Sequence, residues 1–160
     1  MKSGFALFGM ALWSVLVGCG SGGSSTAVVD GVTTTADGMT TFIKAGSYKS
    51  WKAEAKSHDD GNDHGRVRVF FNDKLATSLG ANNTTHPKGA MVVKEIFNDT
   101  GDLTGHAMMI KLKDGSGASS WAFFEGDAPD YKTPEYGVGM EECANCHQAG
   151  KDFIQSPLPK

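Results

Sequence analysis

Residues 89–125 read GAMVVKEIFNDTGDLTGHAMMIKLKDGSGASSWAFFE, and this stretch decides the fold. Apolar and polar side chains alternate in three runs, 89–97, 106–113 and 120–125, which is the pattern of β-strands that bury one face. Short turns rich in Asp and Gly separate these runs. Strands joined by short turns pair antiparallel with their neighbours, so we predict a three-strand meander.

The segments before this meander extend the sheet and cover it. Residues 66–71 alternate in the same way and predict a further strand. Residues 37–57 favour one or two helical segments interrupted near Gly46, and residues 73–79 favour a short helix. The helices and the segment after the sheet are the available covers for its buried face. We therefore predict an α+β fold, in which a mainly antiparallel meander of about four to five strands packs with a few short helices.

The composition is that of one globular domain. The chain has 160 residues, of which 39% are hydrophobic, and nine Phe and three Trp supply enough apolar surface for a core. The 15 Lys and Arg residues oppose 18 Asp and Glu residues, which gives a formal charge of −3. A protein that wraps a phosphate backbone needs a basic surface, so nucleic-acid binding is disfavoured.

The N-terminus has the pattern of an export signal. Lys2 is followed by an uncharged apolar stretch and then by small residues before Cys19. The run Leu16-Val17-Gly18-Cys19 is similar to a bacterial lipobox, so we expect residues 1–18 to be cleaved and Cys19 to carry a lipid anchor. The alternative is a plain secretory peptide in which Cys19 is incidental.

The segment after the signal is rich in Gly, Ser and Thr. We expect residues 19–38 to be a flexible tether and residues 39–160 to be the globular body. The chain is thus expected to be an exported, membrane-anchored lipoprotein that faces the periplasm. Gly20 after the lipidated cysteine favours the outer membrane over the inner one.

The strongest chemical signal is Cys143-Ala144-Asn145-Cys146-His147. Two thiols at this spacing can add to the two vinyl groups of a haem, and the adjacent His147 then becomes an axial ligand of the iron. A thioredoxin-like redox pair needs a βαβ setting that is missing here. A disulfide and a zinc site that recruits His58 and His64 are the other uses of such a pair. We expect covalent haem c.

The motif lies near the end of the chain, and this limits the sixth ligand. No Met follows His147, so a protein ligand on the distal side must come from the upstream sheet, or else the iron keeps an open position for a small molecule. Lys151 and Asp152 follow the motif, where a solvated helix end is expected. The candidate methionine ligands are Met91, Met108, Met109 and Met140.

Together with the haem motif, several ordered blocks resemble the cytochrome P-460 family, which includes the cytochromes c′-beta. The resemblance covers about Tyr48 to Leu158, nearly the whole body. Its blocks are His64-Gly65-x-Val67-Arg68-x-Phe70-x-Asn72, Pro87 to Glu95, Gly105 to Leu112, Trp121-Ala122-Phe123-Phe124-Glu125, and Cys143 to Phe153.

The resemblance implies a haem c in a mainly antiparallel β fold, with His147 as proximal ligand, and commonly a homodimer. Lys94 matches the lysine that is cross-linked to the porphyrin in the family's hydroxylamine-oxidising enzymes. Arg68 matches an arginine that approaches the distal side of the haem. The resemblance therefore implies catalytic roles for Arg68 and Lys94, and a small nitrogenous ligand or gas as the bound molecule.

One feature of those enzymes has no evident match. They use a distal carboxylate from the strand after the lysine strand as proton acceptor, but residues 111–113 offer none, and only Asp114 in the turn is acidic. The c′-beta branch instead presents phenylalanine to a five-coordinate haem that binds nitric oxide or carbon monoxide. Candidates for such a cap are Phe70, Phe71, Phe97, Phe123 and Phe124.

Three functions follow from these observations. The first is a gas-binding haem protein with five-coordinate iron. The second is an oxidoreductase that acts on hydroxylamine, which requires the link through Lys94 and a proton acceptor. The third is a lipid-tethered electron-transfer cytochrome with Met or His as sixth ligand and a redox partner.

Overall fold

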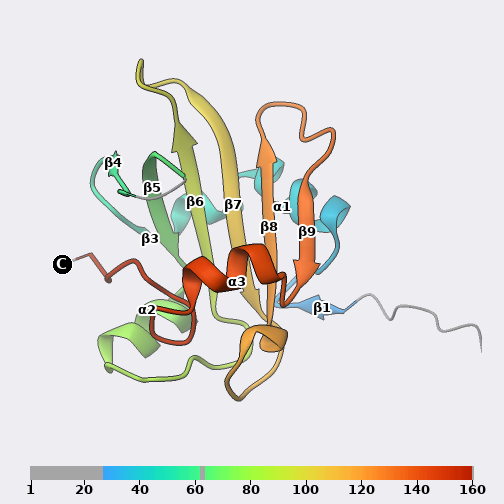
Figure 1. Ribbon diagram of the computed structural model, residues 1–160, viewed down its shortest axis with the longest axis vertical. Coiled ribbons are helices and arrows are strands. Elements are labelled where there is room, and N and C mark those ends of the chain that lie inside the picture. Colours follow the sequence, from blue (N-terminus) through green and yellow to red (C-terminus); the bar gives the residue numbers. More distant parts are fainter. Residues whose placement is uncertain (1–26, 62–63, 160) are drawn as a thin grey trace, which may run out of the picture.

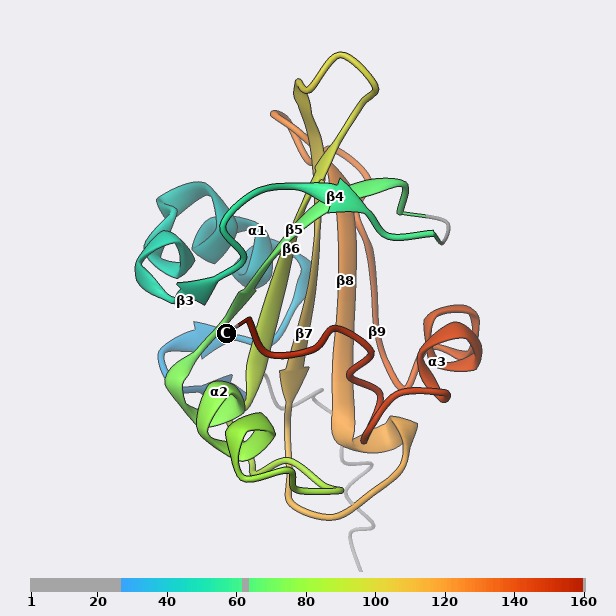
Figure 2. The same cartoon turned by 90° about the vertical axis from the view of Figure 1, so that its left-hand side faces the viewer.

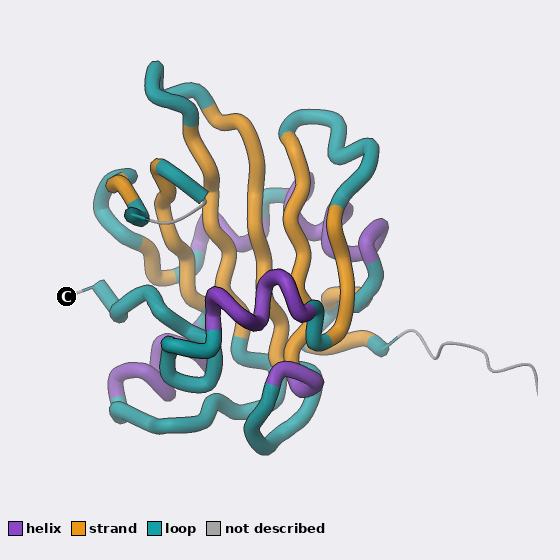
Figure 3. The backbone as a smooth tube through the Cα atoms, in the orientation of Figure 1, coloured by secondary structure: helices purple, strands orange, loops and turns teal. Residues whose placement is uncertain are grey.

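The computed structural model describes residues 27–61 and 64–159, and a seven-stranded antiparallel sheet is its main feature (Figure 1). The strands follow the order β3-β5-β6-β7-β8-β9, and β4 also pairs with β5. Figure 3 shows the strands as the body of the molecule and the helices around it. The predicted α+β class is confirmed. Within the described ranges, no helix has the length and apolar character needed to cross a membrane.

The central strands form the predicted meander and pair antiparallel with one another. A row of facing residues crosses three of them, with Lys94 opposite Ala107 and Ala107 opposite Glu125. Three short strands lack a long alternating pattern and were not predicted: β3 (Lys52–Ala53), β4 (His58–Asp59) and β9 (Glu135–Val138). The central strands are β5 (Arg66–Phe71), β6 (Met91–Phe97), β7 (Leu103–Lys111) and β8 (Trp121–Asp127).

The first helical segments lie where the sequence predicts them. Gly46 separates α1 (Ala36–Ala45) from the 3-10 helix η1 (Ser47–Ser50), because its left-handed φ of 69° ends the first helix. Asn72 caps α2 (Asp73–Gly80) by accepting the backbone N–H of Leu75. The other helical elements are η2 (Ala118–Ser120) and α3 (Glu141–His147), which holds the haem motif.

The folded body begins earlier than the expected boundary at residue 39. The strands β1 (Val28–Val29) and β2 (Val32–Thr33) form a hairpin, and α1 follows directly. Val29 and Val32 are buried in a hydrophobic cluster, so the last part of the expected tether is folded. The expected signal peptide and Cys19 lie outside the described residues.

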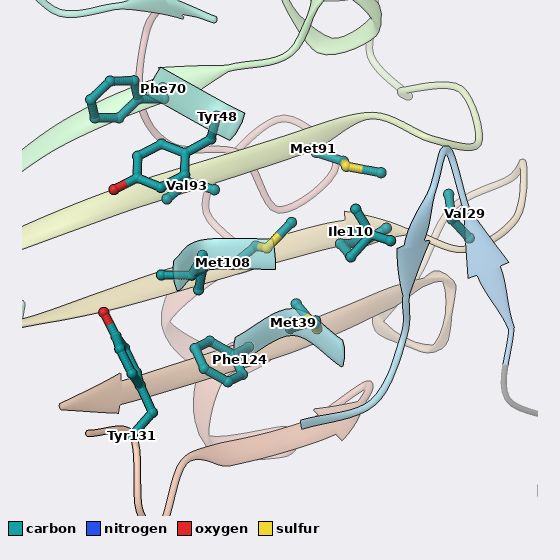
Figure 4. Packing of buried hydrophobic residues seen from close by; sticks show 12 residues of the cluster. Val29, Met39, Tyr48, Phe70, Met91, Val93, Met108, Ile110, Phe124 and Tyr131 are labelled. Atoms are coloured by element: carbon teal, nitrogen blue, oxygen red, sulfur yellow. The ribbon is translucent and has the colours of Figure 1, made fainter. Parts of the chain in front are cut away.

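The sheet separates two hydrophobic clusters. Figures 1 and 2 show α1 on one side of the sheet and α3, with the C-terminal segment, on the other. On the α1 side, Tyr48 packs with Met39 and with side chains of the central strands (Figure 4). The cluster on the α3 side contains Val92 and Phe123. Successive strand residues alternate between the two sides.

Candidate haem site

A cavity of about 370 Å³ lies on the α3 side of the sheet. Its volume falls within the roughly 300–1,000 Å³ that small-molecule and cofactor sites occupy. The strands supply its floor, α3 and the C-terminal segment supply a wall, and the loop after β4 supplies its edge. Side chains that line it include Asp60, His64, Val92, Lys94, Met109, Phe123, Glu125, Cys143, Cys146, His147 and Phe153.

Strand alternation places the floor residues. Lys94 lies on the same side of β6 as Val92, and Glu125 lies on the same side of β8 as Phe123. The intervening strand contributes Ala107, whose small side chain lies between Lys94 and Glu125 in the register. The floor is therefore apolar, with one cation and one carboxylate at its polar end.

The haem motif occupies α3 and faces this cavity. Cys143 is half-buried, Cys146 is exposed, and both thiols are free. Nδ1 of His147 lies 2.8 Å from the carbonyl oxygen of Phe153, so the ring donates its Nδ1–H there and Nε2 keeps the lone pair that could bind an iron. Burial lowers the pKa of His147, which keeps the imidazole neutral as ligation requires.

These residues fit a haem c. Two free thiols, one imidazole with a fixed tautomer and an apolar cavity lie together in one site. The Cys143 and Cys146 thiols would hold the vinyl groups, and His147 would hold the iron. Phe123 and Phe153 form part of the apolar wall, with the Phe123 ring centroid 6.0 Å from that of His147.

The other uses of the cysteine pair find little support in this geometry. Burial raises the pKa of Cys143 to about 11, so the free thiol is protonated at neutral pH. Among residues 27–61 and 64–159, no three His, Cys, Asp or Glu side chains are arranged to hold a metal ion. His58 is exposed and lies 3.5 Å from Glu54.

Lys94 reaches the cavity as a buried cation. Only 8% of its side chain is exposed, and its Nζ lies 2.8 Å from Oδ2 of Asp60. Asp60 comes from the loop after β4, far from Lys94 in the sequence. The family resemblance singled out Lys94, but nothing in the sequence indicated Asp60, because the pairing depends on how the loop folds over the sheet.

Glu125 is the cavity carboxylate that the sequence analysis did not find. It lies two strands beyond β6 rather than on the next one, and Oε2 is 3.4 Å from Nδ1 of His64. The hydrogen bond from His64 lowers the pKa of Glu125, so the carboxylate is ionised at neutral pH. The sequence did carry a signal for Glu125. This residue lies two positions after Phe123, on the same strand face, and a charge on an otherwise apolar strand face marks a special site.

Arg68 is not brought to the cavity. It lies on the opposite side of β5 from Val67 and Val69, where its Nε–H donates to the carbonyl of Glu54 at 2.9 Å. The guanidinium also lies 4.9 Å from the centre of the Phe70 ring. Of the four candidate methionine ligands, Met109 lies on the α3 side of the sheet and lines the cavity, whereas the side chain of Met108 packs in the cluster on the α1 side.

Comparison with known proteins identifies the family of the chain. A search of curated proteins found none that matches the chain. The family model for cytochrome P460 matches residues 45–154, which cover well over half of the chain and include every residue that forms the floor and wall described above. Membership of this family implies a haem protein. The chain belongs to the cytochrome P460 family.

Proposed function

We propose that this protein is a mono-haem c oxidoreductase that oxidises hydroxylamine in the cavity between α3 and the sheet. The observation that carries the proposal is the juxtaposition, in one cavity, of the haem motif, the buried Lys94 and the ionised Glu125. The haem, when bound, supplies the redox centre that takes electrons from the substrate. The residues of the chain bind the substrate, orient it and receive its protons.

Glu125 has the properties of a proton acceptor. Its carboxylate lines the cavity, is ionised at neutral pH, and is 44% exposed, so a proton that it accepts can pass to solvent. Oxidation of hydroxylamine releases protons, and a positioned base contributes about 10²–10⁴-fold to such a reaction. The donor His64 holds the carboxylate at the polar end of the cavity.

Lys94 is held in place by an ion pair with Asp60. The ion pair fixes Nζ inside the cavity rather than leaving it at the surface, where strand lysines usually extend. An amine held at the cavity floor is available for the porphyrin link that the family resemblance implies. The apolar side chains of Val92 and Phe123 belong to the same cavity lining.

The test is a protease digest of the matured holoprotein with mass spectrometry of the haem-bearing peptides. We expect the peptide that holds Lys94 to remain attached to the one that holds Cys143 and Cys146. Lys94→Arg keeps a cation beside Asp60 and should lose both the link and hydroxylamine turnover. Lys74→Met is the matched control, because Lys74 pairs with Asp30 at 2.7 Å on the exposed surface.

Nitric oxide binding is the second candidate, and the apolar part of the cavity lining, which includes Val92 and Phe123, favours it. A haem held by the two thioethers alone, with reversible nitric oxide binding and no hydroxylamine turnover, would favour this function instead. A low-spin six-coordinate ferrous spectrum would favour the electron carrier, with Met109 as ligand.

The location and assembly of the protein are also proposed on the sequence alone. We infer export to the periplasm through residues 1–18, lipid attachment at Cys19, and a homodimer. Metabolic labelling with a radioactive fatty acid should mark the wild-type chain and leave Cys19→Ser unlabelled. Equal labelling of both chains would exclude Cys19 as the lipid site.

A further inference from the structure

The residues that follow the haem motif form a strained turn that packs against the sheet, not the solvated helix end that the sequence suggests. Lys151 and Ile154 exchange both backbone hydrogen bonds at 3.0 Å, which closes a four-residue turn. The two central residues, Asp152 and Phe153, have φ values of 46° and 71°. Such left-handed conformations are unfavourable for a bulky residue and persist only where the surroundings impose them.

The contacts that impose this turn converge on the carboxylate of Asp152. Its side chain is 1% exposed, and Oδ2 accepts from Nζ of Lys111 at 2.6 Å and from the backbone N–H of His86 at 2.9 Å. Oδ1 accepts from Nε1 of Trp121 at 3.3 Å. Three separate parts of the chain therefore fix this one side chain: β7, β8 and the loop before β6.

Lys111, the partner of Asp152 in this ion pair, is also held by its surroundings. Its side chain is completely buried, and Nζ also donates to Oγ of Ser120 at 2.8 Å and lies 4.8 Å from the centre of the Trp121 ring. A buried ion pair costs desolvation and is weak evidence of a purely stabilising role. The presence of this buried ion pair therefore calls for an explanation other than stability.

The geometry beyond the turn supplies that explanation. Phe153, the residue next to Asp152, is the one whose carbonyl accepts the Nδ1–H of His147 at 2.8 Å. The orientation of this carbonyl depends on the left-handed turn, and the turn depends on the Asp152 clamp. A hydrogen bond to Nδ1 fixes the orientation of an axial imidazole and raises the basicity of Nε2 toward the iron.

We propose that the buried ion pair between Lys111 and Asp152 is a positioning device for the axial ligand His147. It holds the Phe153 carbonyl against Nδ1 and thereby sets the strength of the bond between the imidazole and the haem iron. Lys111 and Asp152 are positioning residues, since neither touches the ligand. The inference rests on the haem of the proposed function and is independent of hydroxylamine as its substrate.

The experiment compares haem-loaded variants by resonance Raman spectroscopy of the ferrous protein and by redox titration. Asp152→Ala removes all three contacts and places a residue poorly suited to the left-handed region in the turn. We expect the iron–histidine stretching band to shift to lower frequency and the reduction potential to rise, because a less basic imidazole stabilises ferric iron less. Thioether attachment at Cys143 and Cys146 should remain complete.

Two further variants keep the test decisive. Lys111→Met combined with Asp152→Asn removes the ion pair without leaving a lone buried charge, so it should fold even if Asp152→Ala does not. We expect a smaller shift in the same direction. Tyr48→Phe is the matched control, because it removes buried hydrogen bonds on the α1 side of the sheet and should leave the band and potential unchanged.

The outcomes separate this inference from the proposed function. An unchanged band and potential in whichever of the two variants folds would overturn the positioning role, as would an equal shift in Tyr48→Phe. Hydroxylamine turnover is measured on the same samples. A shifted band in the variants, together with a wild-type protein that does not oxidise hydroxylamine, would contradict the proposed function alone and leave the positioning role supported.

Discussion

At the scale of single residues, Glu125 carries the sharpest prediction about the proposed chemistry. Glu125→Gln keeps the shape of the side chain and removes the base. We expect kcat/KM for hydroxylamine to fall by about 10²–10⁴-fold, the usual contribution of a positioned base. The matched control is Glu135→Gln, which neutralises the cross-strand neighbour at the cavity edge and should change kcat/KM little. Equal losses in both variants would indicate a general charge effect instead.

His106 carries a prediction about stability and pH. Its ring lies between two phenols, with Nε2 2.8 Å from Tyr48 Oη and Nδ1 2.6 Å from Tyr131 Oη. Burial lowers the pKa of His106 from 6.5 to about 4, so the folded protein resists protonation of a ring that the unfolded chain protonates readily. The free energy of unfolding should therefore fall as pH drops from about 6.5 to about 4, by about 3 kcal/mol at most.

Urea denaturation at several pH values measures this effect. His106→Gln should flatten the pH dependence of the unfolding free energy over that window. His58→Gln should leave the wild-type dependence, because His58 is exposed. A wild-type dependence that survives in His106→Gln would assign the effect to another group, such as His86, whose pKa burial also lowers.

Sequence patterns identified residues at this scale unevenly. The Cys143, Cys146 and His147 motif is local and visible in the sequence, and Lys94 was singled out by the family resemblance. Asp60 and Glu125 could not be assigned, because their roles depend on a loop conformation and on the order of strands in space. Arg68 shows the reverse case, in which the alternation itself put the residue on the face away from Lys94.

At the scale of elements, Asn72 joins a helix to the sheet. Its Oδ1 accepts from the backbone N–H groups of Leu75 in α2 and Met91 in β6, each at 3.0 Å, and its Nδ2 donates to the Gly89 carbonyl at 2.7 Å. Asn72→Ala would leave these buried groups without partners. We expect it to lower the free energy of unfolding by about 2–4 kcal/mol.

The matched comparison is the cap of α1. Thr35 accepts one backbone N–H, that of Gly38 at 3.1 Å, so Thr35→Ala should cost about 1 kcal/mol. Chemical denaturation of the two variants gives both values. Similar losses would mean that the links from Asn72 to β6 add nothing to its role as a helix cap.

The elements that the sequence predicted share one property. The central strands and α2 have several residues in a regular pattern, and so their periodicity was visible. The hairpin β1–β2 and the strands β3, β4 and β9 have two to four residues each, too few for a pattern. The turn after α3 was hidden for another reason, since its left-handed residues are imposed by tertiary contacts with Asp152.

At the scale of the whole molecule, the two hydrophobic clusters on either side of the sheet are covered to different extents. The α1 side is closed by α1, η1 and the β1–β2 hairpin, with Met39 and Tyr48 fully packed. On the other side, the cavity lies between the sheet and α3, and Ala144 is the only residue of α3 that is buried. A haem in the cavity would therefore be the main contact that holds α3 to the body.

This difference predicts how the protein responds to loss of haem attachment. In Cys143→Ser combined with Cys146→Ser, the α1 side has all of its contacts and should stay folded, while α3 loses its covalent link to the haem. We expect the backbone amides of α3 to exchange with deuterium faster than in the haem-loaded wild type, whereas the amides of α1 should keep their protection. Hydrogen-exchange mass spectrometry resolves the two regions in one experiment. Equal loss of protection in both helices would show that the two sides of the sheet fold as one unit, and unchanged protection in α3 would show that the Lys111–Asp152 clamp holds this segment without haem.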